Sequence, residues 1–157
     1  MPNMLEQYNK ITRLPAGQFL FNQAIGLKAP FFGKIKPNVL EYRQGFCQIE
    51  IKDRWGVRNH IGTINAGALC TLAEITGGMA LDSSVPKNMR WIPRGMTVDY
   101  IAKATGAITG TSECDVATIA AIKQAEDVVV TVLVKNQQQE TVFKAEINFY
   151  VSLKKNS

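Results

Sequence analysis

The sequence predicts an α+β domain in which a curved antiparallel sheet wraps around one long helix. Three observations support this fold class: an apolar segment of helical character over 65–82, a strand pair before it, and several alternating strand patterns after it. The 157 residues suit a single domain, predicted over 1–157 with a helical N-terminal segment at 1–26 and a core at 30–153. A composition of 46% hydrophobic and 20% charged residues is that of a globular protein.

The predicted elements begin with two short helices, over 3–13 and 16–26, separated by a Pro-Ala-Gly break. Strands are then predicted wherever apolar and polar residues alternate with a period of two. These strands cover 46–52, 96–103 and 143–151. Two further strands are predicted, a polar, Thr-rich one over 105–114 and a central one over 128–134, which is β-branched almost throughout. The three glutamines at 137–139 are predicted to form a hairpin turn, and residues 116–124 to continue a strand rather than form a helical turn.

The segment 65–82 (NAGALCTLAEITGGMALD) is the predicted central helix. Asn65 is a suitable N-cap, and Pro86 closes the segment. Eight of its 18 residues are Ala, Gly or Cys, so the helix is thin enough to be surrounded on most sides. Four larger residues share one helical face: Leu69, Leu72, Thr76 and Met79.

Glu74 is the one formally charged residue between positions 59 and 81, with His60 counted as neutral. The residues three and four positions away on the helix are Thr, Cys and two Gly, and none of these can neutralise a carboxylate. Desolvation in such surroundings raises the pKa of a carboxyl group, as a general base requires. The alternative is a solvent-exposed helix face, because Glu is rarely buried unpaired.

The start of this helix offers backbone donors. The N–H groups of Ala66, Gly67 and Ala68 point outward in the first turn and favour a negative oxygen. Gly67 also lets another molecule approach the backbone closely. The alternative for a glycine at a helix start is plain packing or capping.

Residues 59–74, N-H-I-G-T-I-N-A-G-A-L-C-T-L-A-E, resemble the motif N-x-x-G-x-x-H-G-G-x-x-x-x-L-A-D/E of hotdog-fold thioesterases. Residues 98–112, V-D-Y-I-A-K-A-T-G-A-I-T-G-T-S, resemble a strand-turn-strand unit of the same family, and the order of elements agrees from about Asn22 to Leu153. The chain is most similar to acyl-CoA thioesterase-like proteins of the phenylacetate-pathway type, in a branch with Glu at the acid position. The resemblance implies the hotdog fold, which hosts several reactions.

The resemblance also implies roles for individual residues in the hydrolysis of an acyl-CoA or acyl-carrier thioester. Glu74 takes the position of the general base or nucleophile, and the backbone N–H of Ala66, with Gly67 beside it, takes the oxyanion-hole position. Asn59 matches the Asn that holds the lytic water or the thioester oxygen. Asn65 replaces a His, and an Asn can donate a hydrogen bond but cannot shuttle a proton.

The spacing of these residues favours a site shared between two subunits. Ala66 and Glu74 are eight residues apart, which is about 12 Å of helical rise, too far for one carbonyl to touch both. The resemblance implies a homodimer in which two such helices lie antiparallel, so that each oxyanion hole faces the other subunit's Glu74. Whether two dimers pair into a tetramer is left open.

Two other functions fit parts of the sequence. His60 precedes Glu74 by 14 positions, the spacing of the catalytic pair in hotdog-fold hydroxyacyl dehydratases, although the Pro-Gly elements of those enzymes are missing. A non-catalytic protein that binds acyl-CoA or lipid is the other alternative, because the family's His is absent.

The net charge of +5 favours an anionic partner. No aromatic–basic pattern typical of nucleic-acid binding is present, so the phosphates of coenzyme A are the predicted partner of Arg94 and Lys103. His60 and Gly62, in the polar approach to the helix, are further candidates for substrate binding.

The sequence predicts no metal site and no cofactor other than the coenzyme A of the substrate. Three widely spaced cysteines and a single histidine match neither a zinc pattern nor a disulfide framework. No window approaches the roughly 18 consecutive apolar residues of a membrane span, and the first 15 residues lack the apolar region of a secretory signal. A cytoplasmic protein is therefore predicted.

Overall fold

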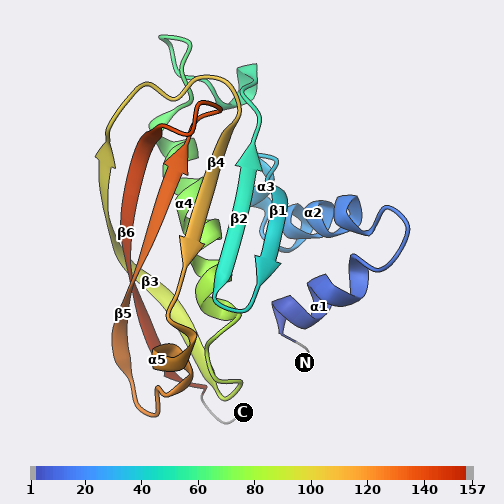
Figure 1. Cartoon of the computed structure of the whole chain (residues 1–157), viewed down its shortest axis with the longest axis vertical. Coiled ribbons are helices and arrows are strands. Elements are labelled where there is room, and N and C mark those ends of the chain that lie inside the picture. Colours follow the sequence, from blue (N-terminus) through green and yellow to red (C-terminus); the bar gives the residue numbers. More distant parts are fainter. Residues whose placement is uncertain (1–2, 155–157) are drawn as a thin grey trace.

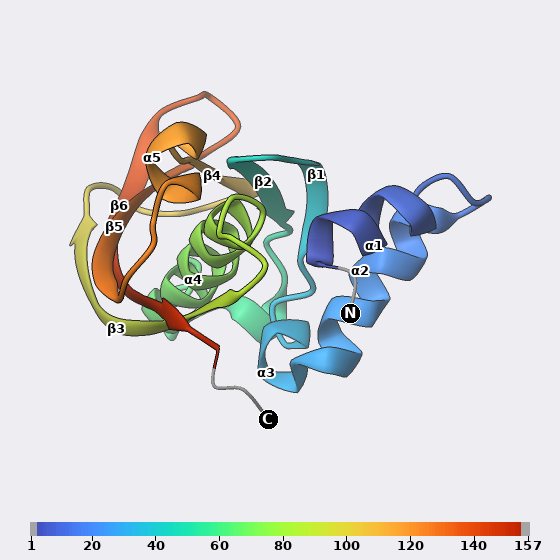
Figure 2. The same cartoon turned by 90° about the horizontal axis from the view of Figure 1, so that it is seen from below.

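A computed structural model describes residues 3–154 as a six-stranded sheet that curves around one helix (Figures 1 and 2). Every neighbouring pair of strands is antiparallel, in the order β1-β2-β4-β5-β6-β3. The strands are β1 (Asn38–Arg43), β2 (Phe46–Ile51), β3 (Met89–Tyr100), β4 (Ile108–Glu113), β5 (Glu126–Lys135) and β6 (Thr141–Leu153). The predicted α+β architecture is thus confirmed.

The helices are α1 (Met4–Ile11), α2 (Gly17–Lys28), α3 (Pro30–Gly33), α4 (Ala66–Asp82) and α5 (Val116–Ala120), with a short 3-10 helix at Trp55–Val57. The central helix α4 matches the predicted segment, and α1 and α2 match the two predicted N-terminal helices. None of the described helices is long and apolar enough to span a membrane.

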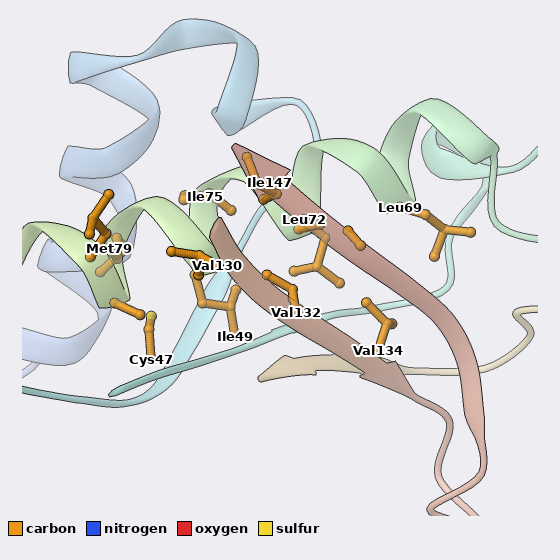
Figure 3. Close-up of a cluster of buried hydrophobic side chains, with 14 of the residues drawn as sticks. Cys47, Ile49, Leu69, Leu72, Ile75, Met79, Val130, Val132, Val134 and Ile147 are labelled. Carbon is orange, nitrogen blue, oxygen red and sulfur yellow. The ribbon is translucent and has the colours of Figure 1, made fainter. Parts of the chain in front are cut away.

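Helix α4 lies in the concave face of the sheet because small residues let the two approach closely. A Cβ at Gly77 would lie 3.0 Å from a methyl group of Val132, and a Cβ at Gly110 would lie 3.1 Å from Leu72 Cγ. Figure 3 shows side chains of α4 meeting those of β5 and β6 in one apolar cluster, which includes Leu72 and Ile147. Such burial of apolar surface is the main force that holds the helix in place.

The predicted strand over 116–124 is wrong, because these residues begin with helix α5. Asp115 caps this helix, and its carboxylate accepts hydrogen bonds from the N–H groups of Ala117 (3.0 Å) and Thr118 (3.3 Å) and from the Thr118 hydroxyl (2.7 Å). This local capping outweighs the β-branched composition of the segment.

The hairpin turn predicted at 137–139 is confirmed between β5 and β6. Asn136 accepts a backbone hydrogen bond from the N–H of Gln139 (3.0 Å), and Gln139 adopts a left-handed conformation with φ of 65°. The strand predicted from 96 begins earlier, at Met89. Strand β1, for which no residue range was predicted, is the partner of β2 in the predicted strand pair, and helix α3 was not predicted.

Strand β3 forms one edge of the sheet. Within the described residues it pairs on one side alone, with β6, over its whole length. Most of its residues are exposed, including Ile92 and Tyr100. The edge of β3 is therefore open to pairing with another chain.

Candidate active site

Glu74 lies on a face of α4 that is less buried than the rest of the helix. Ala66, Cys70 and Glu74 follow one another at intervals of four residues, so they share a face of the helix. Ala66 is exposed, whereas Cys70 and Glu74 are half-buried. The predicted separation of about 12 Å between the start of the helix and Glu74 therefore applies along this face.

The carboxylate of Glu74 is electrostatically isolated. In the part of the chain that the structure describes, no basic side chain pairs with it and no hydrogen-bond donor reaches it. Partial burial raises the pKa of Glu74 above that of an ordinary Glu. The uncharged surroundings seen in the sequence thus leave partial burial as the cause of the raised pKa of Glu74.

The N-terminus of α4 is capped by Asn65. The Asn65 side-chain oxygen accepts a hydrogen bond from the Gly67 N–H (2.7 Å), so this N–H, expected to be free, is engaged within the protomer. The Ala66 N–H has no acceptor among the described residues. Of the three first-turn donors, the N–H groups of Ala66 and Ala68 therefore remain without an acceptor among the described residues, and Ala66 is the exposed one of the two.

Replacing the cap tests its structural role. Asn65→Ala should lower the free energy of unfolding by about 1 kcal/mol, because it removes the acceptor of the Gly67 N–H. For a protein of this size the expected fall in Tm is about 2–4 °C. Asn65→Asp keeps the acceptor and should keep the Tm near that of the wild type, so equal losses in both variants would contradict the capping role.

Asn59 shapes the loop before α4 rather than presenting a free carboxamide. Its side-chain oxygen accepts hydrogen bonds from the N–H groups of Ile61 and Thr63 (3.1 Å each), and its amide donates to the Thr63 hydroxyl (2.8 Å). Gly62 completes the turn in a left-handed conformation with φ of 81°, which favours glycine. His60 is exposed in the same turn, before α4 begins.

The two predicted phosphate-binding residues lie in different surroundings. Lys103 is exposed and precedes Ala104, whose carbonyl accepts a hydrogen bond from the Ile64 N–H (2.9 Å). Lys103 therefore lies beside the loop that carries His60. The Arg94 guanidinium instead lies 3.8 Å from the ring centroid of Tyr150 and 3.3 Å from the carboxylate of Asp127. The structure thus brings Lys103, and not Arg94, to the start of α4.

Two features of the site were not found from the sequence. The thiol of Cys70 is half-buried and lies 3.6 Å from the Tyr100 hydroxyl, on the same face of α4 as Glu74. An apolar cavity of about 270 Å³ also lies between α4 and the N-terminal helices, with Glu74 in its wall. Neither has a local sequence pattern, because each joins segments far apart in the chain.

Among the described residues, no group of three or more His, Cys, Asp and Glu side chains is arranged to hold a metal ion. The chemistry available at the site is that of a carboxylate, backbone N–H groups and an apolar cavity.

A curved antiparallel sheet around one buried helix, with an acidic residue in the middle of that helix, defines the chain as a hotdog-fold protein, as the sequence motif implied. More specifically, it belongs to the family described as "Domain of unknown function (DUF4442)", whose profile matches residues 17–151.

Solved structures agree with this fold over nearly the whole chain. A structural-genomics protein designated APC5556 is 37% identical, with 96% of this chain and 99% of that chain covered and a TM-score of 0.83. PA5026 from Pseudomonas aeruginosa, named a probable thioesterase, is 23% identical, with 90% and 97% covered and a TM-score of 0.78. PaaI of E. coli, from the phenylacetic acid degradation operon, is 16% identical, with 87% and 99% covered and a TM-score of 0.64. No curated protein sequence matches the chain significantly.

Proposed function

We propose that this protein hydrolyses the thioester of an acyl-CoA or acyl-carrier substrate, with Glu74 as general base or nucleophile. The observation that carries the proposal is the unpaired Glu74 carboxylate, whose pKa is raised by burial, in the wall of an apolar cavity. The reaction class is supported by fold neighbours that are named thioesterases, such as PA5026 and HI1161 from Haemophilus influenzae.

The proposed chemistry needs a base and an oxyanion hole. Glu74 takes a proton from water, and the resulting hydroxide attacks the thioester carbonyl. As a nucleophile, the carboxylate would instead attack the carbonyl itself and form an acyl anhydride, which water then hydrolyses to release the acid and regenerate Glu74. The carbonyl oxygen becomes negative and is stabilised by the Ala66 N–H. The carbon–sulfur bond then breaks and sulfur leaves with the electron pair. A thiol of pKa about 8.5 leaves as a thiolate without a general acid, so Asn65 in place of His is compatible with hydrolysis.

The site is proposed to form between two copies of the chain. One carbonyl cannot reach both Ala66 and Glu74 of a single α4, because about 12 Å of helix separates them. A homodimer with antiparallel α4 helices places the Ala66 N–H of one subunit opposite Glu74 of the other. The unpaired edge of β3 and its exposed Ile92 and Tyr100 support such a contact.

The loop before α4 is proposed to hold the coenzyme A end of the substrate. Lys103 and His60 supply positive charge or donors for phosphate beside this loop, and Asn59 and Gly62 fix its shape. Arg94 is a weaker candidate, because its guanidinium already pairs with Asp127 and stacks on Tyr150.

The test is release of free coenzyme A from a panel of acetyl, butyryl, decanoyl, palmitoyl and phenylacetyl thioesters. Turnover of at least one member supports the proposal. Tight binding of a member without turnover of any would favour a non-catalytic acyl-CoA binding protein. Dehydration of a 3-hydroxyacyl-CoA that is lost in His60→Ala would favour a dehydratase. In a single protomer, His60 lies in the loop before α4, whereas Glu74 lies eight residues after Ala66, the first residue of α4.

The pH profile follows from the raised pKa of Glu74. The base must be deprotonated, so kcat/KM should rise with pH through the pKa of Glu74, and this acid limb should lie above about 4.3, where an ordinary Glu titrates. Hydrolysis rates measured from pH 4 to 9 check this. A rate that is flat across this range, or an acid limb that persists in Glu74→Gln, would contradict the role of Glu74.

A further inference from the structure

The cavity beside Glu74 is built by the N-terminal helices. Figure 2 shows α1, α2 and α3 grouped on the side of β1, where the sheet does not cover α4. Helix α3 contacts α4, and α1 and α2 contact β1. The cavity of about 270 Å³ lies between them and takes its walls from all four helices and from Trp91 of β3. The N-terminal segment thus completes a compartment that the sheet and α4 alone would leave open.

The walls of the cavity are almost entirely apolar. Met4 and Ile11 of α1, Phe21 and Ala24 of α2 and Met79 of α4 are typical of the lining. The charged groups in the lining are Glu74 and Lys28. An apolar lining with few polar groups is typical of sites that bind the hydrophobic part of a ligand.

Helix α1 is held in place beside the cavity by aromatic contacts, a hydrogen bond and an ion pair. The Tyr8 ring contacts Phe21 and Tyr42 edge to face, with centroid distances of 4.9 and 5.4 Å, and its hydroxyl donates to Gln18 (3.2 Å). An ion pair of 2.8 Å joins Glu6 to Lys87. Met4 and Ile11 of α1 are half-buried and line the cavity, so these two side chains can contact a ligand there.

Trp91 gives the cavity a fixed wall. Its indole N–H donates to Asp82 (3.0 Å), and its ring meets Phe149 edge to face at 5.2 Å. It packs directly against Gly78, where a Cβ would lie 2.9 Å from the indole ring. The position of Gly78 one turn after Glu74 places this wall next to the carboxylate.

We propose that this cavity binds the acyl chain of the substrate and limits it to medium length, with the thioester carbonyl at Glu74. The placement of the thioester carbonyl at Glu74 rests on the proposed function. A cavity of 150 Å³ accommodates a benzene ring, so 270 Å³ accommodates about ten carbon atoms. Longer chains would extend into solvent and gain nothing from their additional carbons.

The test measures binding rather than turnover, so it remains informative if the protein is inactive. Non-hydrolysable S-alkyl-CoA thioethers with 2 to 16 carbons are titrated into the wild type by calorimetry. Each methylene buried should tighten the Kd by about fourfold up to about ten carbons, after which the Kd should level off. A Kd that does not change with chain length would overturn the proposal, and so would one that keeps improving to 16 carbons.

A filled cavity provides the matched comparison. Ala24→Phe places a benzene-sized ring in the lining, so the Kd should level off at about four carbons and the affinity for the decyl thioether should fall more than about 100-fold. Gln23→Phe, exposed on the same helix and outside the lining, should follow the wild type. Equal losses at every chain length, or the same losses in Gln23→Phe, would overturn the proposal.

Two additions complete the experiment. Ala24→Leu, a smaller substitution, should shift the plateau in the same direction and replaces Ala24→Phe if that variant fails to fold. A phenylethyl thioether tests an aryl group: tighter binding of this compound than of the decyl thioether would overturn the assignment to a medium chain. A chain-length dependence without any hydrolysis would support the cavity assignment and reject the proposed function.

Discussion

Glu74→Gln is expected to lower kcat/KM for acyl-CoA hydrolysis by about 100- to 10,000-fold, the usual contribution of a general base. The substitution keeps the size and hydrogen-bonding capacity of the side chain and removes its ability to accept a proton. No other carboxylate lies on α4 before Asp82, at its last residue, so none on this helix can take over the role. Initial rates on the best thioester of the panel check this.

The stability of Glu74→Gln separates loss of chemistry from loss of structure. Because burial raises the pKa of Glu74, the folded state favours the protonated form. The free energy of unfolding therefore falls as the pH rises from the pKa of Glu74 in the unfolded chain to its higher pKa in the folded protein. This loss of stability persists at neutral pH. A neutral Gln avoids it, so Glu74→Gln should unfold at a Tm no lower than the wild type.

The control for this variant is Glu126→Gln, at the exposed start of β5. It makes the same chemical change away from α4 and should hydrolyse thioesters at the wild-type rate. If Glu74→Gln kept more than about a tenth of the wild-type kcat/KM, Glu74 would not be the base or nucleophile.

The fold was predictable because its local patterns agree with one another. The small residues of 65–82 predicted a helix surrounded on most sides, and the structure buries most of α4 in the concave sheet. Strand β6 alternates buried residues with more accessible ones, as its sequence alternates apolar and polar residues, and the β-branched run of β5 also forms the strand that its composition predicted. The strand predicted over 116–124 was wrong because a single capping residue, Asp115, decides between helix and strand. A hydrophobic periodicity carries no information about such a cap.

The candidate site was predictable only where one short segment defines it. The isolation of Glu74 could be seen from the sequence, because its neighbours on the helix are uncharged. The engagement of the Gly67 N–H by Asn65 depends on side-chain geometry, and the cavity depends on how α1 packs against α4, some 60 residues later in the chain. Such contacts between distant segments leave no periodic pattern in either of them.

Ala66→Pro is expected to lower kcat by about 100- to 1,000-fold, the usual cost of removing one oxyanion-hole donor. Proline lacks the N–H but suits the first residue of a helix, where this N–H has no intrahelical acceptor. The preceding Asn65 has ψ of 142°, in the extended region that a following proline favours. The variant thus removes the proposed donor while the backbone keeps its conformation.

Mixing two inactive variants tests whether the site is shared between subunits. When Ala66→Pro and Glu74→Gln are co-expressed and pair at random, half of the dimers are mixed, and each mixed dimer contains one site with both an intact Glu74 and an intact Ala66 N–H. The expected rate is therefore about a quarter of the wild-type rate per dimer. Recovery of activity also shows that both variants fold, since each supplies half of the working site. A mixture no more active than the two variants measured separately would place Glu74 and its oxyanion hole in the same subunit and exclude the antiparallel pairing of α4 helices.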